Sequence, residues 1–475
     1  MQPHHNVKTL KLRGYQGDTI PIWPGRGDNS ASFDFPNLVT LRIVNCSELL
    51  YLPWQIGKLP RLKTLEISGL PNMEYVADSE TLVSNEGSSL FPYLDFLEIS
   101  ELPKLKGWWR RTESGSHVVN PSESYHGETI PRWPRRGDNS ALFDFPNLVT
   151  LKIKNCSELL YLPWQIRKLP YLKTLHISRL LNMEYVADSE TLVSDEGLSF
   201  FPSLDNLSIH ELPKLKGWWR RSESGSHMVN SNDSRRSREG QVEWESSPCF
   251  PLLKILSIRN CGNMMFVPLC PQLEELIIYD SRADMRCAHR PLSCTKLKRL
   301  EINNLEWLKS MPIEYTQFLS EIEIVSDRRM ERLGEVNEFP TSLLSSVRTL
   351  RIGICPKLVS IRGWLEHLSA LEYLYIRDCP KVELGGMSWH NLAATLQHLE
   401  LMKELPEGLQ YCTSLKYLYI RNCPNLKSMP KWMPKLTSLQ ELIIGWCSRS
   451  LKERCQQPNG EDWPLVHHIS RIDMW

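Results

Sequence analysis

The chain has 475 residues, 13 cysteines and a formal net charge of +1, so no global field concentrates nucleic acid or an anionic membrane surface near it. The opening MQPHHNVKTLKLRGYQG lacks the apolar core of a secretory signal, and no apolar run approaches the roughly 20 residues that cross a bilayer. We therefore expect a cytoplasmic or nuclear protein with reduced thiols, no membrane insertion and no nucleic-acid partner.

An internal duplication organises the first half of the chain. Residues 17–120 reappear nearly letter for letter at 127–230, so that FDFPNLVTLRIVNCSELLYLPWQI from Phe33 returns as FDFPNLVTLKIKNCSELLYLPWQI from Phe143. Each copy is itself a stack of shorter leucine-spaced units, which is typical of a repeat architecture.

The shorter unit follows the pattern LxxLxLxx(N/C) of a leucine-rich repeat. In LVTLRIVNC from Leu38, the side chains of Leu41 and Ile43 point inward and those of the residues between them point outward. We predict an α/β solenoid, a leucine-rich-repeat horseshoe with a parallel concave sheet and an irregular convex side, which forms one domain over residues 1–475. About sixteen frames start at Val7, Leu38, Leu62, Leu94, Leu148, Leu172, Leu204, Leu253, Leu273, Leu297, Leu319, Val347, Leu371, Leu396, Leu415 and Leu439.

Two long gaps between frames and the chain end depart from this regularity. Polar stretches at about 110–142 and 220–248 are too poor in apolar residues to pack, and we expect flexible insertions there. Both follow a GWWRR sequence, whose tryptophans we expect to cap the apolar core rather than to bind a partner. Residues 450–475 are expected to form a C-terminal cap.

A cysteine recurs in one slot of the repeat. Regular placement favours a small buried side chain that packs against the turn, over redox sensing or metal binding. The slot holds Cys46, Cys156, Cys261, Cys355, Cys379, Cys423 and Cys447.

No catalytic motif is present: the sequence lacks GxxxxGK(S/T), HExxH, GxSxG and an acidic calcium loop. We predict that the chain is not an enzyme and holds no cofactor or metal.

Outward positions of the later strands indicate a protein-binding surface. Tyrosine and arginine contribute strongly when a partner buries them, although tyrosine also favours strands for its β-propensity alone, and both interpretations stay open. The candidate residues are Tyr373, Tyr375, Arg377, Tyr417, Tyr419 and Arg421.

The two copies differ mainly on the same predicted face. Six of nine outward positions have changed across the three shared strands, whereas the inward leucines and isoleucines are identical. Diversification of a concave binding surface on a fixed scaffold leaves this pattern. The differing pairs are Arg42 and Lys152, Val44 and Lys154, Glu66 and His176, Phe96 and Asn206, Glu98 and Ser208, and Ser100 and His210.

Several motifs resemble a known family. They are LKLRGYQGDTIPIW near the start, the turns LPNMEYV and LPKLKGWW, LKSMP at 426–430, and the ending RCQQPNGEDWPLVHHISRI from Arg454. The chain resembles the C-terminal leucine-rich-repeat region of plant intracellular nucleotide-binding disease-resistance proteins of the coiled-coil type. The family ending GEDWPxIxHIPxI is matched by Gly460, Glu461, Asp462, Trp463, Pro464, His468 and Ile469, while Ser470 replaces the usual proline.

The resemblance implies an innate-immune recognition module that binds a pathogen effector, a guarded host protein or the nucleotide-binding module of an intact receptor. The sequence contains no nucleotide-binding module or coiled coil, so we expect no ATP-driven switch within it. A repeat-only scaffold or adaptor outside immunity and a truncated, nonfunctional remnant are the alternatives.

Overall fold

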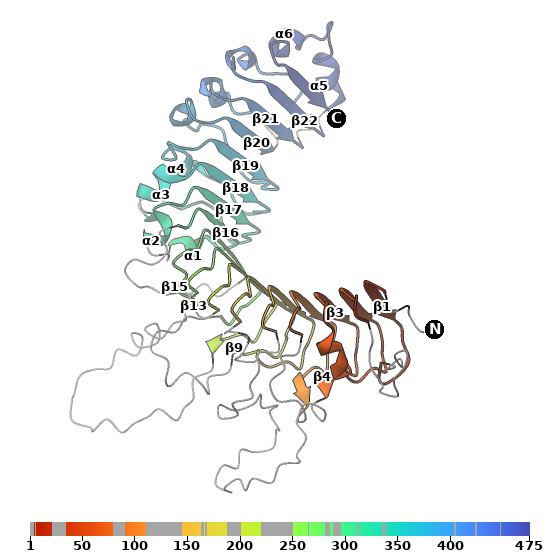
Figure 1. Ribbon diagram of the computed structural model, residues 1–475. Helices are drawn as coiled ribbons and strands as arrows, with labels where there is room; N and C mark the ends of the chain where they lie inside the picture. Colours follow the sequence, from red (N-terminus) through yellow and green to blue (C-terminus); the bar gives the residue numbers. More distant parts are fainter. Residues whose placement is uncertain are drawn as a thin grey trace, which may run out of the picture. The chain divides into compact units, whose positions relative to one another are not determined.

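The chain divides into two compact units, Met1–Pro271 (unit 1) and Gln272–Trp475 (unit 2), and each is described by itself (Figure 1). The computed structural model describes residues 4, 6–20, 35–78, 91–110, 145–162, 166, 169–187, 201–219, 250–264, 266–280, 286–287, 296–309, 311, 313–334, 338–339, 341–402, 405–422, 425–446 and 448–475. The predicted insertions lie almost wholly outside these residues.

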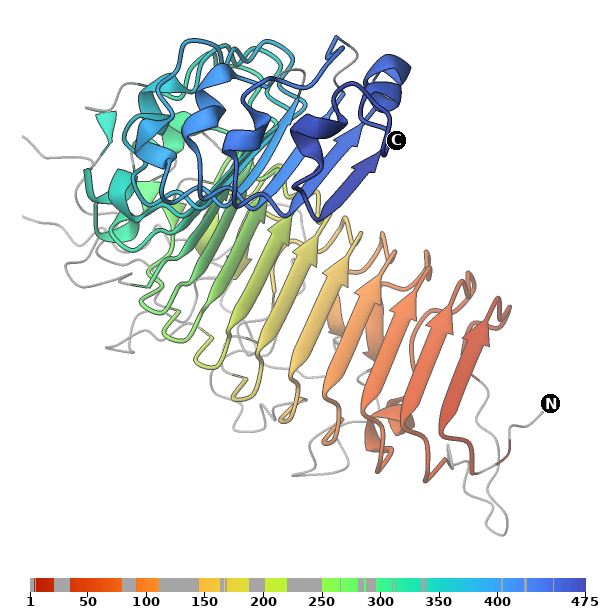
Figure 2. The same ribbon diagram turned by 90° about the horizontal axis from the view of Figure 1, so that it is seen from above.

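Unit 1 contains a parallel sheet in which each strand pairs with the next along the chain. Figure 2 shows its strands side by side with their arrowheads at one edge. The register places equivalent residues opposite each other, such as Leu41 beside Leu65 and Leu97 beside Leu151. The strands are β1 (Thr9–Arg13), β2 (Thr40–Val44), β3 (Thr64–Ser68), β5 (Phe96–Ser100), β7 (Thr150–Lys154), β8 (Thr174–Ser178), β10 (Asn206–His210) and β12 (Ile255–Arg259).

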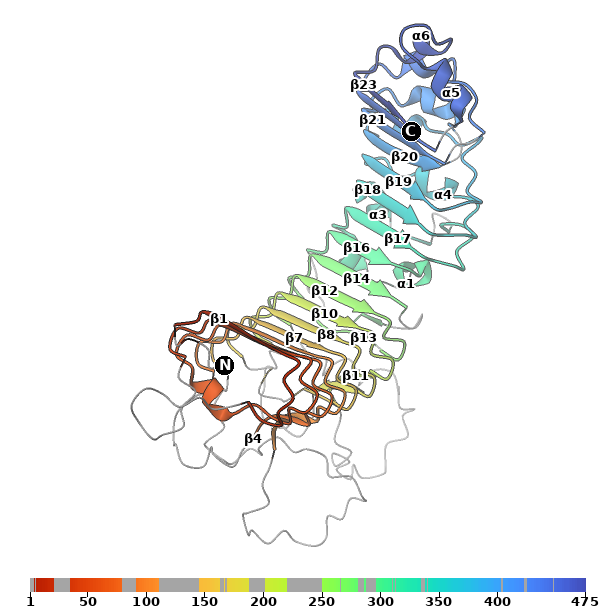
Figure 3. The ribbon, with the colours of Figure 1, turned by 90° about the vertical axis from the view of Figure 1, so that its right-hand side faces the viewer.

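Unit 2 shows the same pattern of parallel strands (Figure 3). Its strands are β14 (Glu275–Tyr279), β16 (Arg299–Ile302), β17 (Glu321–Val325), β18 (Thr349–Gly353), β19 (Tyr373–Arg377), β20 (His398–Met402), β21 (Tyr417–Arg421), β22 (Glu441–Gly445) and β23 (Arg471–Met474). Every predicted frame therefore forms a strand. Strand β23 was not predicted, because RIDM lacks the leucine frame, and it lies within the segment expected to be a cap.

The core follows from the period-two alternation in each strand. In β2 the side chains of Leu41 and Ile43 are fully buried, and the register stacks them on Leu65 and Ile67 of β3. Because each repeat contributes the same two inward positions, leucines and isoleucines form continuous buried columns.

The turn position that recurs after each strand is defined by its backbone conformation. Asn45 has φ of 54° and Asn155 has φ of 53°, in the left-handed region that asparagine tolerates better than other residues with a Cβ. The N–H group of Asn45 donates to the carbonyl of Ser68 at 2.9 Å, and that of Asn155 donates to Ser178 at 3.0 Å. The turn residue thus extends the ladder between strands by one hydrogen bond.

The cysteine that follows packs beneath this turn, as predicted. Each thiol of this slot whose side chain is described is buried and donates to the carbonyl two residues earlier, at 3.2 to 3.5 Å. Burial raises the pKa of Cys156 to about 12 and that of Cys261 to about 11, so these thiols stay protonated. The bonded residues are Cys46, Cys156, Cys261, Cys355 and Cys379; Cys423 and Cys447 lie outside the described residues.

The return segments are irregular, which confirms that part of the predicted fold. Helices α1 to α4 lie along the side of unit 2 away from its strands (Figure 1). Unit 1 has the short paired strands β4 (Tyr75–Asp78) with β6 (Gly107–Arg110) and β9 (Tyr185–Ala187) with β11 (Gly217–Trp219). The other elements are η1 (Trp54–Lys58), β13 (Phe266–Val267), β15 (Arg286–Cys287), α1 (Leu305–Lys309), α2 (Ile313–Thr316), α3 (Thr341–Ser346), α4 (Arg362–Leu365), η6 (His390–Leu392), η7 (Glu407–Tyr411), η8 (Met433–Lys435), α5 (Arg449–Arg454) and α6 (Trp463–Val466).

One tryptophan of the GWWRR sequences can be placed. Trp218 on β11 is 1% exposed and packs edge to face against Phe250, with ring centroids 5.2 Å apart. Its predicted role in the core is confirmed. The side chains of the other tryptophans and arginines of the two sequences lie outside the described residues.

The GEDWP ending has a structural role in unit 2. Asp462 is 3% exposed and accepts hydrogen bonds from the backbone N–H of Met429 at 2.8 Å and from Nε and Nη2 of Arg454 at 2.9 and 2.8 Å. Although burial opposes ionisation, these bonds hold the pKa of the Asp462 carboxyl below its usual value. The LKSMP and GEDWP motifs are therefore joined through one buried carboxylate.

Candidate functional site

The candidate surface is the open face of each sheet, which we define as the first, third and fifth residue of each strand. Most of these side chains are exposed or half-buried and alternate with the buried leucines and isoleucines, whereas Ser257, Glu301 and Glu400 at third positions are buried. All predicted site residues lie there. Unit 1 holds Arg42, Val44, Glu66, Phe96, Glu98, Ser100, Lys152, Lys154, His176, Asn206, Ser208 and His210, and unit 2 holds Tyr373, Tyr375, Arg377, Tyr417, Tyr419 and Arg421.

Ion pairs join neighbouring strands in the first part of unit 1. Arg42 Nε lies 2.8 Å from Glu66 Oε2, and Lys154 Nζ lies 3.0 Å from Glu98 Oε1. Lys152 Nζ lies 5.2 Å from the centroid of the Phe96 ring. Because pairs this exposed each contribute only about 0–1 kcal/mol, a partner can replace them at little cost.

Two histidines meet on the next strands. The rings of His176 on β8 and His210 on β10 are 5.2 Å apart and nearly perpendicular, and His210 Nε2 lies 2.9 Å from Oγ of the buried Ser257. Burial lowers the pKa of His176, and the charges of Lys154 and Lys152 lower it further. Burial and the neighbouring His176 lower the pKa of His210 to about 4. Both rings are therefore neutral at pH 7.

The remaining predicted site residues of unit 1 have short side chains and lie between the charged groups. In the register, each lies beside another short side chain or beside a lysine or histidine of the site. Val44 lies beside Ser68, Ser100 beside Lys154, Asn206 beside Thr174 and Ser208 beside His176.

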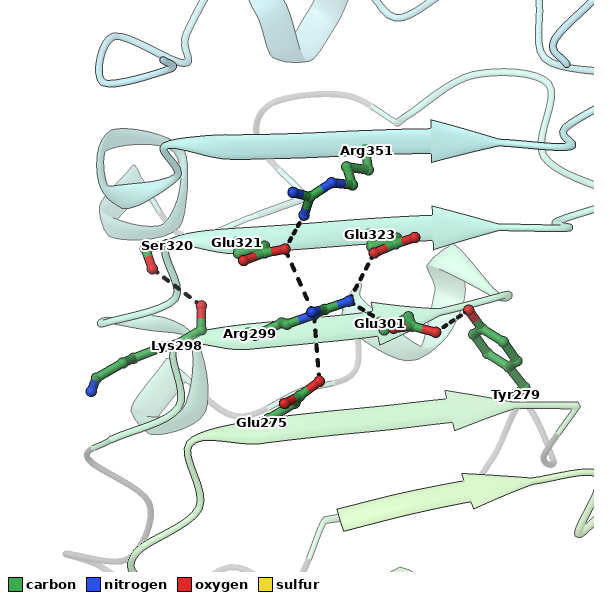
Figure 4. A network of polar contacts seen from close by, with 9 residues as sticks. All are labelled: Glu275, Tyr279, Lys298, Arg299, Glu301, Ser320, Glu321, Glu323 and Arg351. Carbon is green, nitrogen blue, oxygen red and sulfur yellow. Dashed lines mark hydrogen bonds and ion pairs between the residues drawn. The ribbon is translucent and has the colours of Figure 1, made fainter. Parts of the chain in front are cut away.

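Unit 2 carries a polar network that the sequence analysis did not predict (Figure 4). The guanidinium of Arg299 lies among four carboxylates from three strands. Its Nη2 is 3.0 Å from both Glu301 and Glu323, and its Nε is 3.5 Å from Glu275 and 3.6 Å from Glu321. The available signal was the recurrence of glutamate and arginine at the first and third positions of successive frames.

Two further residues extend this network. Arg351 on β18 pairs with Glu321, and the Tyr279 hydroxyl donates to Glu301 (Figure 4). Burial, and then the charge of Glu301, raises the pKa of Glu323. Four carboxylates against two guanidinium groups leave this part of the open face with excess negative charge.

A buried carboxylate brings two predicted site residues together. Glu400 on β20 is 2% exposed, and its two oxygens lie against Arg377 Nη2 on one side and Arg421 Nε, at 2.7 Å, on the other. The hydrogen bond with Glu400 raises the pKa of Arg377. Both arginines thus neutralise a buried charge in addition to being exposed on the face.

Aromatic rings stack beside the ion-pair cluster of Glu400, Arg377 and Arg421. His398 lies between Tyr373 and Tyr417, with ring centroids 4.4 and 4.2 Å apart and interplanar angles of 20° and 11°. The Arg351 guanidinium lies 5.0 Å from the centroid of the Tyr375 ring. Stacked tyrosines with adjacent arginines form a rigid surface of the composition found in protein-binding hot spots.

The described part of the chain offers neither a metal site nor a membrane-spanning helix. Its His, Cys, Asp and Glu residues form no group of three or more that is arranged to hold a metal ion. Within the same residues, no helix is both long and apolar enough to span a bilayer.

Residues 1–70 match the family model of R13L1/DRL21 leucine-rich repeats. Stretches of 108 residues are 33% and 30% identical to the putative disease resistance proteins RGA1 and RGA4 of Solanum bulbocastanum, and each covers 22% of this chain but only 10% of the relative.

Solved structures give weaker matches. The TLR13–ssRNA13 complex is 14% identical, with a TM-score of 0.48 over 93% of this chain and 65% of that chain. The Leptospira interrogans leucine-rich-repeat protein LIC12759 is 15% identical, with a TM-score of 0.44 over 92% of this chain and 90% of that one. The chain has the leucine-rich-repeat fold, and its sequence matches confirm the resemblance to the leucine-rich-repeat regions of plant disease-resistance proteins.

Proposed function

We propose that this chain is the recognition region of a plant intracellular immune protein and binds a pathogen effector or a guarded host protein through the open faces of its sheets. The observation that carries the proposal is the contrast between the two copies. Six of nine open-face positions differ, while the buried columns beneath them are identical. The matches to disease-resistance proteins support the immune context.

The physical basis is a rigid backbone with exchangeable side chains. Neighbouring strands keep one register, so an outward substitution leaves the buried columns unchanged. Short polar, charged and aromatic side chains then occupy most open-face positions. Such a surface suits a partner that brings its own complementary charges and rings.

Recognition is proposed without chemistry or nucleotide-driven switching in these 475 residues, which contain no phosphate-binding motif. The nucleotide-binding module of an intact receptor would then be a second class of partner. Under this proposal the chain acts in the cytoplasm or the nucleus.

Site-specific photo-crosslinking tests the proposed binding face. A benzophenone amino acid is placed at Thr174 and Tyr417 on the open faces, and at Tyr171 and Leu181, which are 57% and 50% exposed and lie off these faces, as controls. In extracts of pathogen-challenged leaves, we expect adducts at the open-face positions only. Equal labelling at the controls would contradict the proposal.

The immune role needs a separate measurement. Deleting the coding sequence should change the growth of at least one pathogen strain in a panel. Unchanged growth throughout, together with open-face adducts in unchallenged tissue, would favour a scaffold outside immunity.

A further inference from the structure

We propose that the open face of β7, β8, β10 and β12 binds an acidic segment of a partner protein. We name this surface the basic face, and it comprises Lys152, Lys154, His176, His210 and Arg259. The inference rests on the proposed function, because it names the chemistry of the partner bound at an open face.

The direction of change between the copies is the first argument. Three of the six differences alter formal charge, and all three make the second copy more positive. One arginine and two glutamates in the first copy stand against two lysines in the second, so the net formal charge of these positions changes from −1 to +2. The three substitutions are Val44 to Lys154, Glu66 to His176 and Glu98 to Ser208.

The composition of the four strands is the second argument. Their twelve open-face positions hold two lysines, one arginine and two histidines, and no carboxylate. The carboxylate of Glu98 on the preceding strand β5 pairs with Lys154, whereas Lys152 Nζ lies over the Phe96 ring. The carboxylate that offsets the charge of Lys154 therefore lies at the β5 edge of the basic face. A partner's carboxylates can approach the ammonium groups from the rest of the face.

Short side chains leave the lysines and the histidines of the basic face accessible. Ser208 lies directly beside His176 and beside Ser257 in the register, and Ser178 lies beside both Lys154 and His210. No long side chain at these positions covers the histidines. Carboxylates of an extended segment running across the strands can approach the lysines and both imidazoles in turn.

Protonation of His176 and His210 should be coupled to binding at the basic face. The groups that face them are Lys152 and Lys154 on β7, Arg259 on β12, and the carboxylates of Glu98 and Glu211. In the free protein, burial and, to a smaller extent, the neighbouring cations lower the pKa of both rings and keep them neutral. A bound carboxylate favours the imidazolium form, so binding takes up protons and strengthens as the pH is lowered.

The experiment uses the full chain and two fluorescein-labelled dodecapeptides, which are identical except that every glutamate of one is glutamine in the other. Fluorescence anisotropy at low salt should show binding of the acidic peptide at least about tenfold tighter than that of the glutamine peptide. Affinity should fall as sodium chloride is raised.

The duplication supplies a matched variant. Lys154→Val, His176→Glu and Ser208→Glu together install the residues that the first copy holds at these positions, so the scaffold already accommodates them. This variant should lose at least about tenfold in affinity for the acidic peptide. The reciprocal control, Val44→Lys with Glu66→His and Glu98→Ser, should bind at least as tightly as the unmodified chain. Circular dichroism checks that both variants are folded, and Lys152→Gln gives a second, single-site loss.

Three outcomes would overturn the inference. They are equal binding of the two peptides, unchanged affinity in the triple variant and in Lys152→Gln, or displacement of the acidic peptide by a single-stranded oligonucleotide at much lower concentration. If open-face crosslinks form but the acidic peptide does not bind, this inference alone fails. If the peptide binds but no open-face crosslink forms, the proposed function fails.

Discussion

The ion pairs of Glu400 with Arg377 and Arg421 allow a quantitative prediction of how much these residues stabilise unit 2. Arg377→Ala with Arg421→Ala removes both cations from a carboxylate that is only 2% exposed. Breaking a buried ion pair from one side typically costs about 3–5 kcal/mol, because the remaining charge is left without compensation. Since the two arginines are themselves 56% and 40% exposed, we expect the lower end of this range, about 3 kcal/mol of unfolding free energy.

Removing the charge should restore part of that loss. Glu400→Gln in the double variant keeps the side-chain volume but eliminates the uncompensated charge, and we expect a recovery of about 2 kcal/mol. Glu400→Gln alone leaves two arginines that water can solvate, so it should cost only about 1 kcal/mol.

Urea unfolding of the full chain, followed by tryptophan fluorescence, measures these differences. Hydrogen exchange of the amides in β19, β20 and β21 gives a local readout, because repeat proteins respond mainly within neighbouring repeats. A double variant as stable as the unmodified chain, or a triple variant less stable than the double, would refute the reasoning. A binding test that replaces Arg377 and Arg421 therefore needs the triple variant as its control.

Three further predictions concern packing and protonation. Trp218→Ala should cost about 3–5 kcal/mol in urea unfolding, because it empties a buried site against Phe250, and Trp218→Phe should cost less. With a folded pKa of about 4 against about 6.5 when unfolded, His210 binds fewer protons in the folded state between these values. Stability should consequently fall as the pH is lowered through this window, and less so in His210→Ser, as urea midpoints at pH 7 and 5 would show. Cys156 and Cys261, whose pKa values burial raises to about 12 and about 11, should react with N-ethylmaleimide only after unfolding; mass-spectrometric labelling of the native chain would contradict this.

The fold was predictable where its cause is local. Alternation such as Leu41 and Ile43, with a turn residue and a cysteine after them, spans only nine residues, and it predicted every strand of the long parallel sheet but one. It did not predict the short paired strands of the return segments. Strand β23 depends on a distant partner instead: Ile472 lies beside Leu442 of β22, and its own segment has no leucine frame. Hydrogen bonding to the edge strand β22 stabilises β23 as a strand, although its sequence lacks the leucine pattern.

The candidate site was predictable in position but not in contacts. Strand alternation places Arg377 and Arg421 on the open face, yet it does not indicate that both turn towards Glu400 on the strand between them. The partners of Arg299 likewise come from β14, β16 and β17, and the choice among them depends on rotamers and distances across strands. A periodic pattern specifies a face, whereas ion pairs require the three-dimensional register.

The contacts also separate two causes of divergence between the copies. Glu98 with Lys154 and Phe96 with Lys152 both join β5 to β7, the strands that the duplication made neighbours, so the residues at those positions also contribute to the junction between the copies. Position 66 and its equivalent, 176, lie away from that junction. Glu66 pairs with Arg42 inside the first copy, and His176 contacts His210 inside the second. The exchange of a carboxylate for an imidazole there has no role in joining the copies, which makes His176→Glu the single substitution most informative about partner chemistry on the basic face.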